Sequence, residues 1–495
     1  MSYLLGIDLG TSSVKSLIID TEGHIISVGQ EDYDFDIPQI GYAENDPMVW
    51  WNATKNTIRT ALAKGKIIPS EIKGIGFSGQ MHGLVAVDKN GQVVRKGIIW
   101  ADQRSSEQIN FVKEKIGLEK FSKVTLNAPA TGFMLLSLLW VKDNEPENYR
   151  KINKVMMPKD FIRMKLTGKI GTESVDASSS VAFDTAGRHW AWELIDELGL
   201  ERDLFPECKE ACDIAGEIIS EAAEETGLTV GTPVVYGGGD QPMQSVGNGL
   251  VRPGYVASNI GTASQIACCV DRPVYDPQLR TNTFCHADKN IWTILGASLN
   301  GGIAQKWLRD NIFYKESYKK LDAEAETIEP GSEGLIFLPY LCGERTPCLD
   351  PLSRGIFFGL TIKHTQAHMV RAVMEGMVFS LKDGLEIFNS LGVTTDKIIA
   401  SGGGAKSPLL LQMQADVFEQ DIYTTESKEQ ASFGAAICAG VGVGIYDSLA
   451  AACDQLIVMS PVVTHPIPEN SKVYRQRYQV YKQLYGRNKD LFSLL

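Results

Sequence analysis

Two short turns rich in glycine and hydroxyl residues are candidate phosphate-binding elements. Residues 8–15 (DLGTSSVK) contain the first, and residues 260–264 (IGTAS) repeat its core half a chain later. A tight hairpin between two strands exposes backbone N–H groups and hydroxyls that can hold phosphate oxygens. Asp8 can face a magnesium ion on those phosphates, and Lys15 adds a positive charge. Taken singly, each segment is also compatible with an ordinary turn.

A lone carboxylate after three glycines is the candidate general base. Gly237 to Gly239 follow a short apolar run, allow a close approach of substrate and place Asp240 at the end of a strand. Phosphoryl transfer to a hydroxyl needs a base near the attacking oxygen. An isolated aspartate in such a loop can equally be a turn residue.

Two further segments that follow strands carry side chains suited to a polyol. Gln80 and His82 can hydrogen-bond sugar hydroxyls, and Met81 can form an apolar wall. Trp100 offers a planar face and Arg104 a guanidinium. Sugars are bound by this mixture of planar surface and paired hydrogen bonds. A structural histidine and a strand-edge tryptophan with a surface ion pair are the alternatives.

The sequence lacks the common nucleotide-binding signatures. Gly-Lys occurs at residues 65–66 and 168–169, each time followed by Ile, and no GxGxxG turn follows the first strand. The turn at residues 402–407 (GGGAKS) lies between a predicted strand and helix and can hold a nucleoside against the backbone. A simple tight turn is the alternative there.

The pattern of elements that must position these residues predicts an α/β protein of two domains. Strands precede each glycine turn, and helices are predicted over residues 46–64, 366–391 and 474–489, the last as a solvated amphipathic helix. The repeated turn in the two halves favours an internal duplication. We place the boundary at residue 244, which gives domains over residues 1–244 and 245–495.

Composition limits the class of protein. The chain has 495 residues, a net charge of −12 and a pI of about 5.2. This acidity argues against a nucleic-acid partner or an anionic membrane surface. No apolar run approaches the ~18 residues of a membrane span, and the N-terminus does not resemble a signal peptide, so a cytoplasmic location is expected. The scattered cysteines predict free thiols rather than a zinc site.

Taken together, these segments resemble the FGGY carbohydrate kinases, in order and over nearly the whole chain. Within that family, the sequence Gln-Met-His-Gly favours kinases of xylulose over glycerol kinases. The matching segments are residues 8–12 (DLGTS), 79–83 (GQMHG), 100–104 (WADQR), 238–241 (GGDQ), 284–287 (FCHA), 343–347 (GERTP), 354–360 (RGIFFGL) and 402–405 (GGGA).

The resemblance implies two ribonuclease-H-like domains of the actin and hexokinase type, with a deep cleft between them and with ATP and Mg²⁺ as cofactors. It implies that Asp240 is the general base and that Asp8 and Asp240 position the metal. The phosphate and nucleotide positions would be Thr11, Ser12, Lys15, Gly261, Thr262, Gly302, Gly403, Gly404 and Ser407. The sugar positions would be Gln80, Met81, His82, Trp100, Arg104, Asp240 and Gln241.

The expected activity is transfer of a phosphoryl group from ATP to the terminal hydroxyl of a small ketose, with D-xylulose as the leading candidate. A kinase of ribulose, gluconate or fuculose, an actin-like ATPase and a non-catalytic sugar sensor are the alternatives. Two departures from the family pattern, Lys306 for glutamine and Gln241 for asparagine, leave details of binding and the exact sugar open. A homodimer is compatible with the resemblance.

Overall fold

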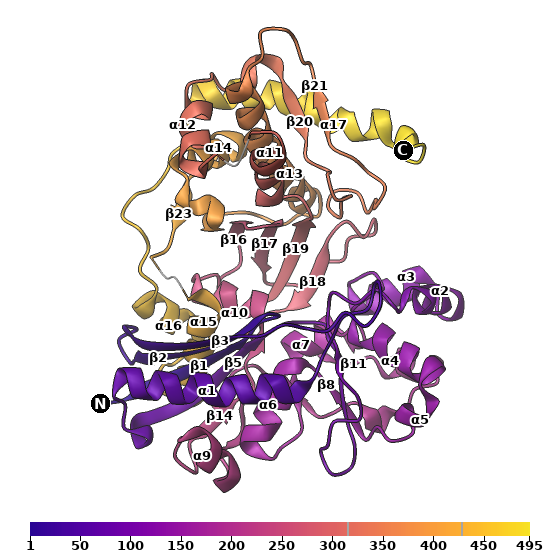
Figure 1. Cartoon of the computed structure of the whole chain (residues 1–495), viewed down its shortest axis with the longest axis vertical. Coiled ribbons are helices and arrows are strands. Elements are labelled where there is room, and N and C mark those ends of the chain that lie inside the picture. The colour runs from indigo at the N-terminus through magenta and orange to yellow at the C-terminus, as the bar shows by residue number, and fades with distance from the viewer. Residues whose placement is uncertain (314–315, 427–428) are drawn as a thin grey trace.

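In the computed structural model, which describes residues 1–313, 316–426 and 429–495, the chain forms two lobes around two mixed β-sheets (Figure 1). The strands of the first sheet are β1 (Tyr3–Leu9), β2 (Ser13–Asp20), β3 (Ile25–Asp32), β5 (Ile72–Gly79), β13 (Ile214–Glu217), β14 (Pro233–Val235) and β15 (Gly238–Gly239). Those of the second are β16 (Tyr255–Ile260), β17 (Ser264–Val270), β18 (Asn282–Cys285), β19 (Trp292–Ser298), β22 (Lys397–Gly402) and β23 (Ile422–Thr424).

The central strands of the two sheets repeat one topology. The first sheet contains the order β3-β2-β1-β5-β14, and the second contains β19-β17-β16-β22-β23. In both sheets, the first three strands in this order pair antiparallel. The strand that precedes the glycine turn pairs in parallel with a later strand: β1 with β5, and β16 with β22. The two glycine turns therefore lie at equivalent places, as the duplicated sequence predicted, and the α/β fold of two ribonuclease-H-like halves is confirmed.

Helices cover both sheets. The first lobe carries α1 (Pro47–Gly65), α6 (Pro158–Thr167), α7 (Ser174–Ser179), α9 (Ser220–Thr226) and α10 (Asp240–Gly247), with α2 (Ser106–Lys115), α3 (Leu118–Thr125), α4 (Met134–Asn144), α5 (Pro146–Tyr149) and α8 (Trp192–Glu197) at its periphery. The second lobe carries α11 (Gly302–Asn311), α12 (Tyr318–Glu326), α13 (Gln366–Ser390), α14 (Pro408–Phe418) and α17 (Pro468–Phe492). The predicted helices over residues 46–64 and 366–391 are thus α1 and α13.

Two helices from the second half of the sequence belong to the first lobe. They are α15 (Gln430–Gly442), which packs on the first sheet, and α16 (Leu449–Leu456), which packs against α15 and α10. A Cβ atom on Gly6 of β1 would lie 1.9 Å from the carbonyl oxygen of Ser432, and one on Gly76 of β5 would lie 2.0 Å from that of Ala435. Glycine is needed at both positions because the helix lies directly on the strands. The predicted boundary at residue 244 therefore separates the two sheets along the chain, but it does not separate all the helices that cover them.

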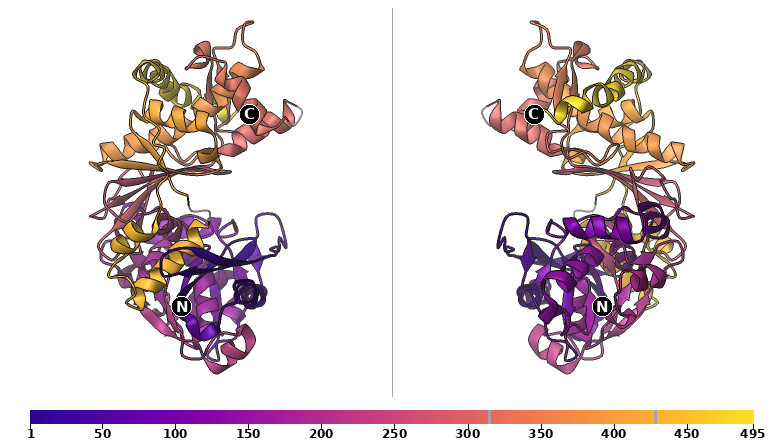
Figure 2. Two further views of the ribbon diagram at one scale, coloured as in Figure 1. Left: turned by 90° about the vertical axis from the view of Figure 1, so that its left-hand side faces the viewer. Right: turned by 90° about the vertical axis from the view of Figure 1, so that its right-hand side faces the viewer.

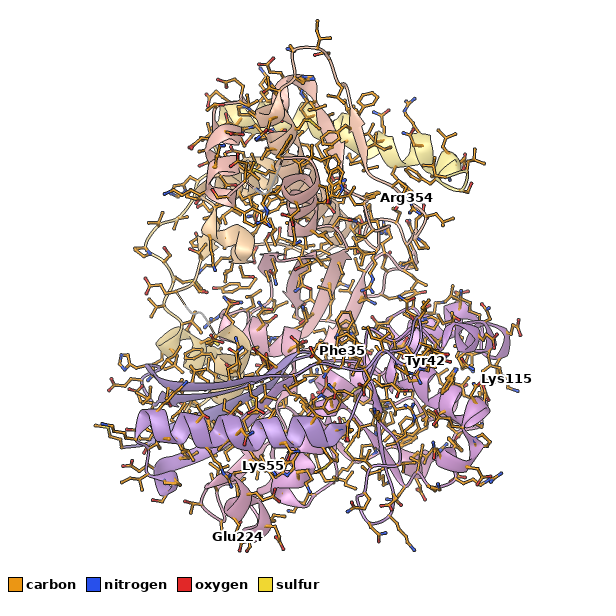
Figure 3. All side chains as sticks on the ribbon, viewed as in Figure 1. Phe35, Tyr42, Lys55, Lys115, Glu224 and Arg354 are labelled. Carbon is orange, nitrogen blue, oxygen red and sulfur yellow. The ribbon has the colours of Figure 1, made fainter. Side chains whose placement is uncertain are left out.

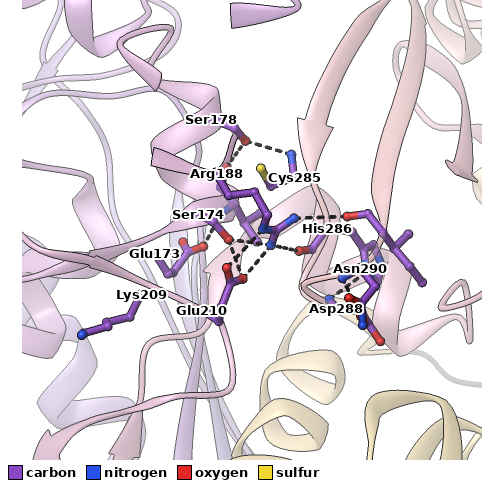
Figure 4. Close-up of polar contacts among 12 residues, drawn as sticks. Glu173, Ser174, Ser178, Arg188, Lys209, Glu210, Cys285, His286, Asp288 and Asn290 are labelled. Carbon is purple, nitrogen blue, oxygen red and sulfur yellow. Dashed lines mark hydrogen bonds and ion pairs between the residues drawn. The ribbon is translucent and has the colours of Figure 1, made fainter. Parts of the chain in front are cut away.

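The lobes are joined along one side, where the β18–β19 hairpin of the second sheet contacts the first lobe (Figures 2 and 4). The Arg188 guanidinium, from the first lobe, ion-pairs with Glu210 at 2.6 Å and donates to the carbonyl oxygens of His286 at 3.1 Å and Ile291 at 3.3 Å. The backbone N–H of Cys285 donates to Ser178 Oγ at 3.0 Å. These contacts link β18 and β19 to the α7 region, and we call them the hairpin attachment.

All nine cysteines are free thiols, as the sequence predicted. The buried ones are Cys268, Cys269, Cys285, Cys438 and Cys453. Among the helices in the described part of the chain, none combines the length and the apolar character that a membrane span requires.

The C-terminal helix α17 is less solvated than its sequence predicts. Tyr474, Tyr478 and Tyr481 are each 1% exposed, so the expectation of a solvated helix is wrong for this face. The Tyr478 hydroxyl donates to Asp383 Oδ1 of α13 at 2.6 Å. Burial raises the pKa of Asp383 to about 7, because its carboxylate lies among tyrosine rings with little water.

We expect Asp383→Asn to stabilise the protein at alkaline pH. The unfolded chain ionises this carboxyl near pH 3.8, whereas the folded chain does so near 7, so wild-type stability falls as pH rises between these values. Asparagine keeps an acceptor for Tyr478 and carries no charge. Thermal unfolding at pH 8 should show the variant more stable by about 1–2 kcal/mol, with a smaller difference at pH 5. A variant less stable than wild type at pH 8 would contradict this.

Candidate active site

Two aromatic side chains donate hydrogen bonds to the first glycine turn. The backbone N–H of Gly10 donates to the carbonyl oxygen of Ser13 at 2.9 Å, and the Tyr33 hydroxyl donates to that of Gly10 at 2.5 Å. Trp100 Nε1 donates to Thr11 Oγ1 at 2.8 Å, while 46% of the tryptophan remains exposed. Thr11 and the exposed Ser12 therefore lie at an accessible turn beside a planar aromatic face, which suits a phosphate bound near a sugar.

Carboxylates gather at the ends of β1 and β15. Asp8 accepts a hydrogen bond from Ser78 Oγ at 2.6 Å, and Lys15 Nζ lies 2.8 Å from Glu429 Oε2. Burial raises the pKa of Asp8. Burial, and then the nearby charge of Asp8, raise the pKa of Asp240 to about 7. Asp240 begins α10 and accepts from the backbone N–H of Gln241 at 2.8 Å, so its side chain is held at the start of the helix.

This group of charges suits a hard divalent cation. Asp8, Asp240 and Glu429 can each carry a negative charge, and Lys15 is the positive group acting on Asp8. Carboxylate oxygens are the ligands that Mg²⁺ prefers. Burial, together with the charge of Glu429 on Asp8 and that of Asp8 on Asp240, raises both pKa values. A cation there would favour the ionised carboxylates, so the residues present fit the metal that the sequence predicted.

Behind the Asp240 loop lies a fully buried charge cluster that sequence reasoning missed. Lys159 Nζ lies 2.7 Å from Asp160, 3.1 Å from Glu173 and 3.1 Å from Asp176, and all four side chains are 0% exposed. The Arg163 guanidinium also binds Asp160, at 2.6 Å. Lone charged residues on a helix carry no sequence signal that they will meet in this way.

The cluster packs directly against the glycines before Asp240. A Cβ atom on Gly239 would lie 2.4 Å from Met81 Cγ and 3.0 Å from Asp176 Oδ1. One on Gly79 would lie 2.8 Å from Lys159 Cβ. A side chain at either position would clash, because β5 and β15 lie so close to the charge cluster. The same close packing places Met81 beside the Asp240 loop.

His82 has the geometry of a neutral hydrogen-bond acceptor. Its backbone adopts φ 72°, a strained conformation for a residue other than glycine and one that is frequent at functional sites. Nδ1 lies 2.9 Å from the carbonyl oxygen of Ser179, which can only accept, so Nδ1 carries the proton. Burial lowers the pKa of His82 to about 4, which keeps the ring uncharged at neutral pH. Nε2 can then accept from a hydroxyl.

Two residues predicted to contact the sugar, Gln80 and Arg104, bind other protein groups instead, and a third, Gln241, lines a separate cavity. Gln80 is 1% exposed, and its Nε2 lies 3.4 Å from the carbonyl oxygen of Gly10. The Arg104 side chain is 1% exposed, pairs with Asp102 and Glu44, and stacks 3.9 Å from the ring centroid of Tyr42. Figure 3 labels Tyr42 on the first lobe. Gln241 lines a small polar cavity between α10 and the second sheet. In this arrangement Gln80 and Arg104 support the walls of the site.

The second lobe contains a pocket of about 810 Å³ at the second glycine turn. The backbone N–H groups of Gly302 and Ile303, at the start of α11, donate to the carbonyl oxygens of Gly261 at 2.8 Å and Thr262 at 3.0 Å. Six predicted nucleotide positions line the pocket together: Gly261, Thr262, Gly302, Gly403, Gly404 and Ser407.

The pocket also has lining residues that the sequence did not single out. Tyr318, Asp322 and Glu326 of α12 form one side. Lys306, the departure from the family pattern, also lines the pocket and ion-pairs with Asp310 at 2.8 Å. The size and the backbone-rich floor of this pocket suit a nucleoside, with its phosphates directed along the glycine turn.

Comparisons with known proteins agree with this geometry. Residues 3–247 match the N-terminal domain, and residues 256–443 the C-terminal domain, of the FGGY family of carbohydrate kinases. The chain is 34% identical to xylulose kinase of Lactococcus lactis over 99% of this chain and 98% of the relative. It superposes with TM-score 0.93 on ligand-bound xylulose kinase from Lactobacillus acidophilus, at 27% identity and covering 100% and 99% of the two chains. Gluconate kinase from the same organism gives the same TM-score at 27% identity, covering 98% of each chain.

Proposed function

The chain belongs to the FGGY family of carbohydrate kinases, and from this premise we propose that it phosphorylates D-xylulose at its terminal hydroxyl, using ATP. The observation that carries the proposal is the position of Asp240 close to Asp8 beside the first glycine turn, where burial, and then the charge of Asp8, raise the pKa of Asp240 to about 7. A carboxylate with a pKa near the working pH is suited to accept a proton and release it again.

In the proposed reaction, Asp240 accepts the proton of the sugar's terminal hydroxyl, O5 in xylulose. That oxygen attacks the γ-phosphorus of ATP in line, the bond to the bridging oxygen breaks, and ADP leaves. Lys15 and the two glycine turns stabilise charge on the phosphates. Asp8 and Asp240 would hold Mg²⁺, which supplies further charge neutralisation when bound.

The remaining residues would position the sugar. Neutral His82 would accept a hydrogen bond from a hydroxyl at Nε2, and Met81 would form an apolar wall next to Asp240. Trp100 would cover the sugar beside the first glycine turn. The pocket at Gly302 and Gly403 would hold the nucleoside, so that the γ-phosphate points toward the first lobe.

Xylulose is the substrate we favour because relatives of that name match the chain over nearly its whole length. Gluconate is the second candidate, because a gluconokinase of Bacillus subtilis is 31% identical over 98% of this chain. The relevant chemical difference is a carboxylate in gluconate where xylulose has a hydroxymethyl ketone.

A coupled assay of ADP release over ketoses, aldoses, polyols and sugar acids tests the proposal. We expect kcat/KM to be highest for D-xylulose, and ATP consumption to depend on the sugar. A higher kcat/KM for gluconate would overturn the choice of substrate. Rapid ATP consumption that no sugar increases would overturn the assignment of sugar phosphorylation.

A further inference from the structure

The indole of Trp100 is bonded by one edge to the first glycine turn. Its Nε1 donates to Thr11 Oγ1 at 2.8 Å, while 46% of the residue remains exposed. The N–H group lies in the plane of the indole, so this bond uses an edge of the ring and leaves the faces of the ring free. The proposed function gives a role to one face, which would cover the sugar, and none to the edge that contacts Thr11.

The bond from Trp100 determines where the Thr11 hydroxyl can send its proton. An indole nitrogen only donates, so the Thr11 oxygen must be the acceptor in this bond. A hydroxyl carries a single proton, which must then point away from the indole N–H. Within the described part of the chain, no acceptor receives that proton. The Thr11 hydroxyl is therefore a donor available to an acceptor that a ligand brings.

Other polar groups of the first glycine turn also favour a ligand that accepts hydrogen bonds. The Tyr33 hydroxyl donates to the carbonyl oxygen of Gly10 at 2.5 Å, and the Tyr33 backbone N–H to that of Ser12 at 2.9 Å. The carbonyl oxygen of Ser13 accepts from the backbone N–H of Gly10 at 2.9 Å. Among the residues that the structure describes, none accepts from the backbone N–H groups of Thr11 and Ser12. The turn thus offers unused donors, which suit phosphate oxygens.

The segment that carries Trp100 is firmly held by the first lobe. Gly132 has φ 78°, and a Cβ atom there would lie 2.0 Å from the carbonyl oxygen of Trp100. Two residues after Trp100, the buried carboxylate of Asp102 accepts from the backbone N–H of Ala43 at 2.7 Å and pairs with Arg104 at 2.7 Å. These contacts fix the backbone on which the indole sits, so the fold itself directs the indole N–H at Thr11.

We propose that Trp100 is a positioning residue for the phosphoryl donor, which holds Thr11 Oγ1 as an acceptor so that the Thr11 proton points at a phosphate oxygen of ATP. This rests on the proposed function, which places the phosphates at this turn. A donor whose direction is fixed before the ligand arrives binds charge without first having to reorient. One ring would thus contact the sugar with its face and orient a phosphate contact with its edge.

A double-mutant cycle tests whether Trp100 acts through Thr11. Trp100→Phe removes the N–H group and keeps an aromatic face, and Thr11→Val removes the hydroxyl and keeps the branched shape. The readout is the Kd of AMP-PNP, a non-hydrolysable analogue of ATP, measured with Mg²⁺ by isothermal titration. We expect each single change to raise Kd roughly 3- to 10-fold, the range for one hydrogen bond. The double variant should bind no more weakly than Thr11→Val, because the indole N–H has no effect without the hydroxyl.

Two further variants separate positioning from a general effect on the fold. Thr11→Ser keeps the hydroxyl and should recover most of the affinity that valine loses. Trp51→Phe is the matched control for the indole, because Trp51 Nε1 donates to Glu225 at 3.1 Å, between α1 and α9 and away from the glycine turns. Its Kd should equal that of wild type. A Kd for Trp100→Phe equal to that of Trp51→Phe would overturn the proposal, and so would single effects that multiply in the double variant.

The binding cycle and the proposed function can fail separately. Titration of AMP-PNP requires neither a sugar nor phosphoryl transfer, so it decides the role of Trp100 whichever sugar the wild type prefers. The coupled assay over the panel of sugars decides the substrate: a preference for gluconate overturns that choice and leaves the comparison of Kd values intact. If wild-type protein binds no AMP-PNP, both proposals fail.

Discussion

Asp240→Asn should lower kcat by at least ~10²-fold while leaving ATP affinity close to that of wild type. Asparagine has the shape of the aspartate and can still accept the hydrogen bond from the Gln241 backbone N–H, so the loop should keep its conformation. It cannot take up the proton of the attacking hydroxyl. The measurements are kcat and KM from the coupled ADP assay, together with nucleotide affinity by isothermal titration.

The exposed Asp203 provides the control, since Asp203→Asn changes the same functional group away from the carboxylate pair. Turnover of Asp240→Asn within a few-fold of that control would refute the role of the base. The pH profile gives a second readout. Because the pKa of Asp240 is raised to about 7 and the base acts as the carboxylate, kcat/KM should fall about tenfold per unit below that pH.

Lys159→Met is the second change for which we expect a large effect, here on stability. Lys159 Nζ contacts Asp160, Glu173 and Asp176, and all four side chains are 0% exposed. Removing the amine leaves these carboxylates with too little positive charge around them in a dry interior. Breaking a buried ion pair in this way costs about 3–5 kcal/mol of unfolding free energy. Urea unfolding at pH 7.5 would measure the loss.

Two comparisons sharpen this experiment. Lys151→Met removes an amine from an exposed position of the same lobe and should change stability by about 0.5 kcal/mol or less. The deficit of Lys159→Met should shrink as pH falls, because burial raises the pKa values of Glu173 and Asp176 and protonation removes their charge. A stability equal to that of Lys151→Met at pH 7.5 would show that the cluster is not held by Lys159.

The sequence predicted the parts of this protein that depend on local pattern. The two glycine turns, the duplicated strand order and the helices α1 and α13 all follow from short-range spacing and capping residues. The family resemblance implied six nucleotide positions that come together in one pocket. The wrong expectation for α17 has a simple cause: tyrosine has a polar tip, and the sequence does not show that buried partners such as Asp383 satisfy it.

What escaped prediction depends on contacts between distant segments. Glu429 pairs with Lys15 across 414 positions, and no local motif marks it. The return of α15 to the first sheet is equally invisible, because its apolar sequence would suit either lobe. Arg104 has the residue type of a sugar contact, yet Asp102, Glu44 and Tyr42 surround its guanidinium in the folded chain.

The hairpin attachment determines which parts of the second lobe would be displaced most if the two lobes rotated relative to each other. A rotation about an axis near Arg188 moves each atom in proportion to its distance from that axis. Phe284 of β18, beside His82, lies at the attached edge of the sheet, whereas Gly403 follows β22, four strands across, or roughly 20 Å at the usual strand spacing. Such a rotation would therefore change the contact between Phe284 and His82 little, and it would move the nucleoside pocket much further.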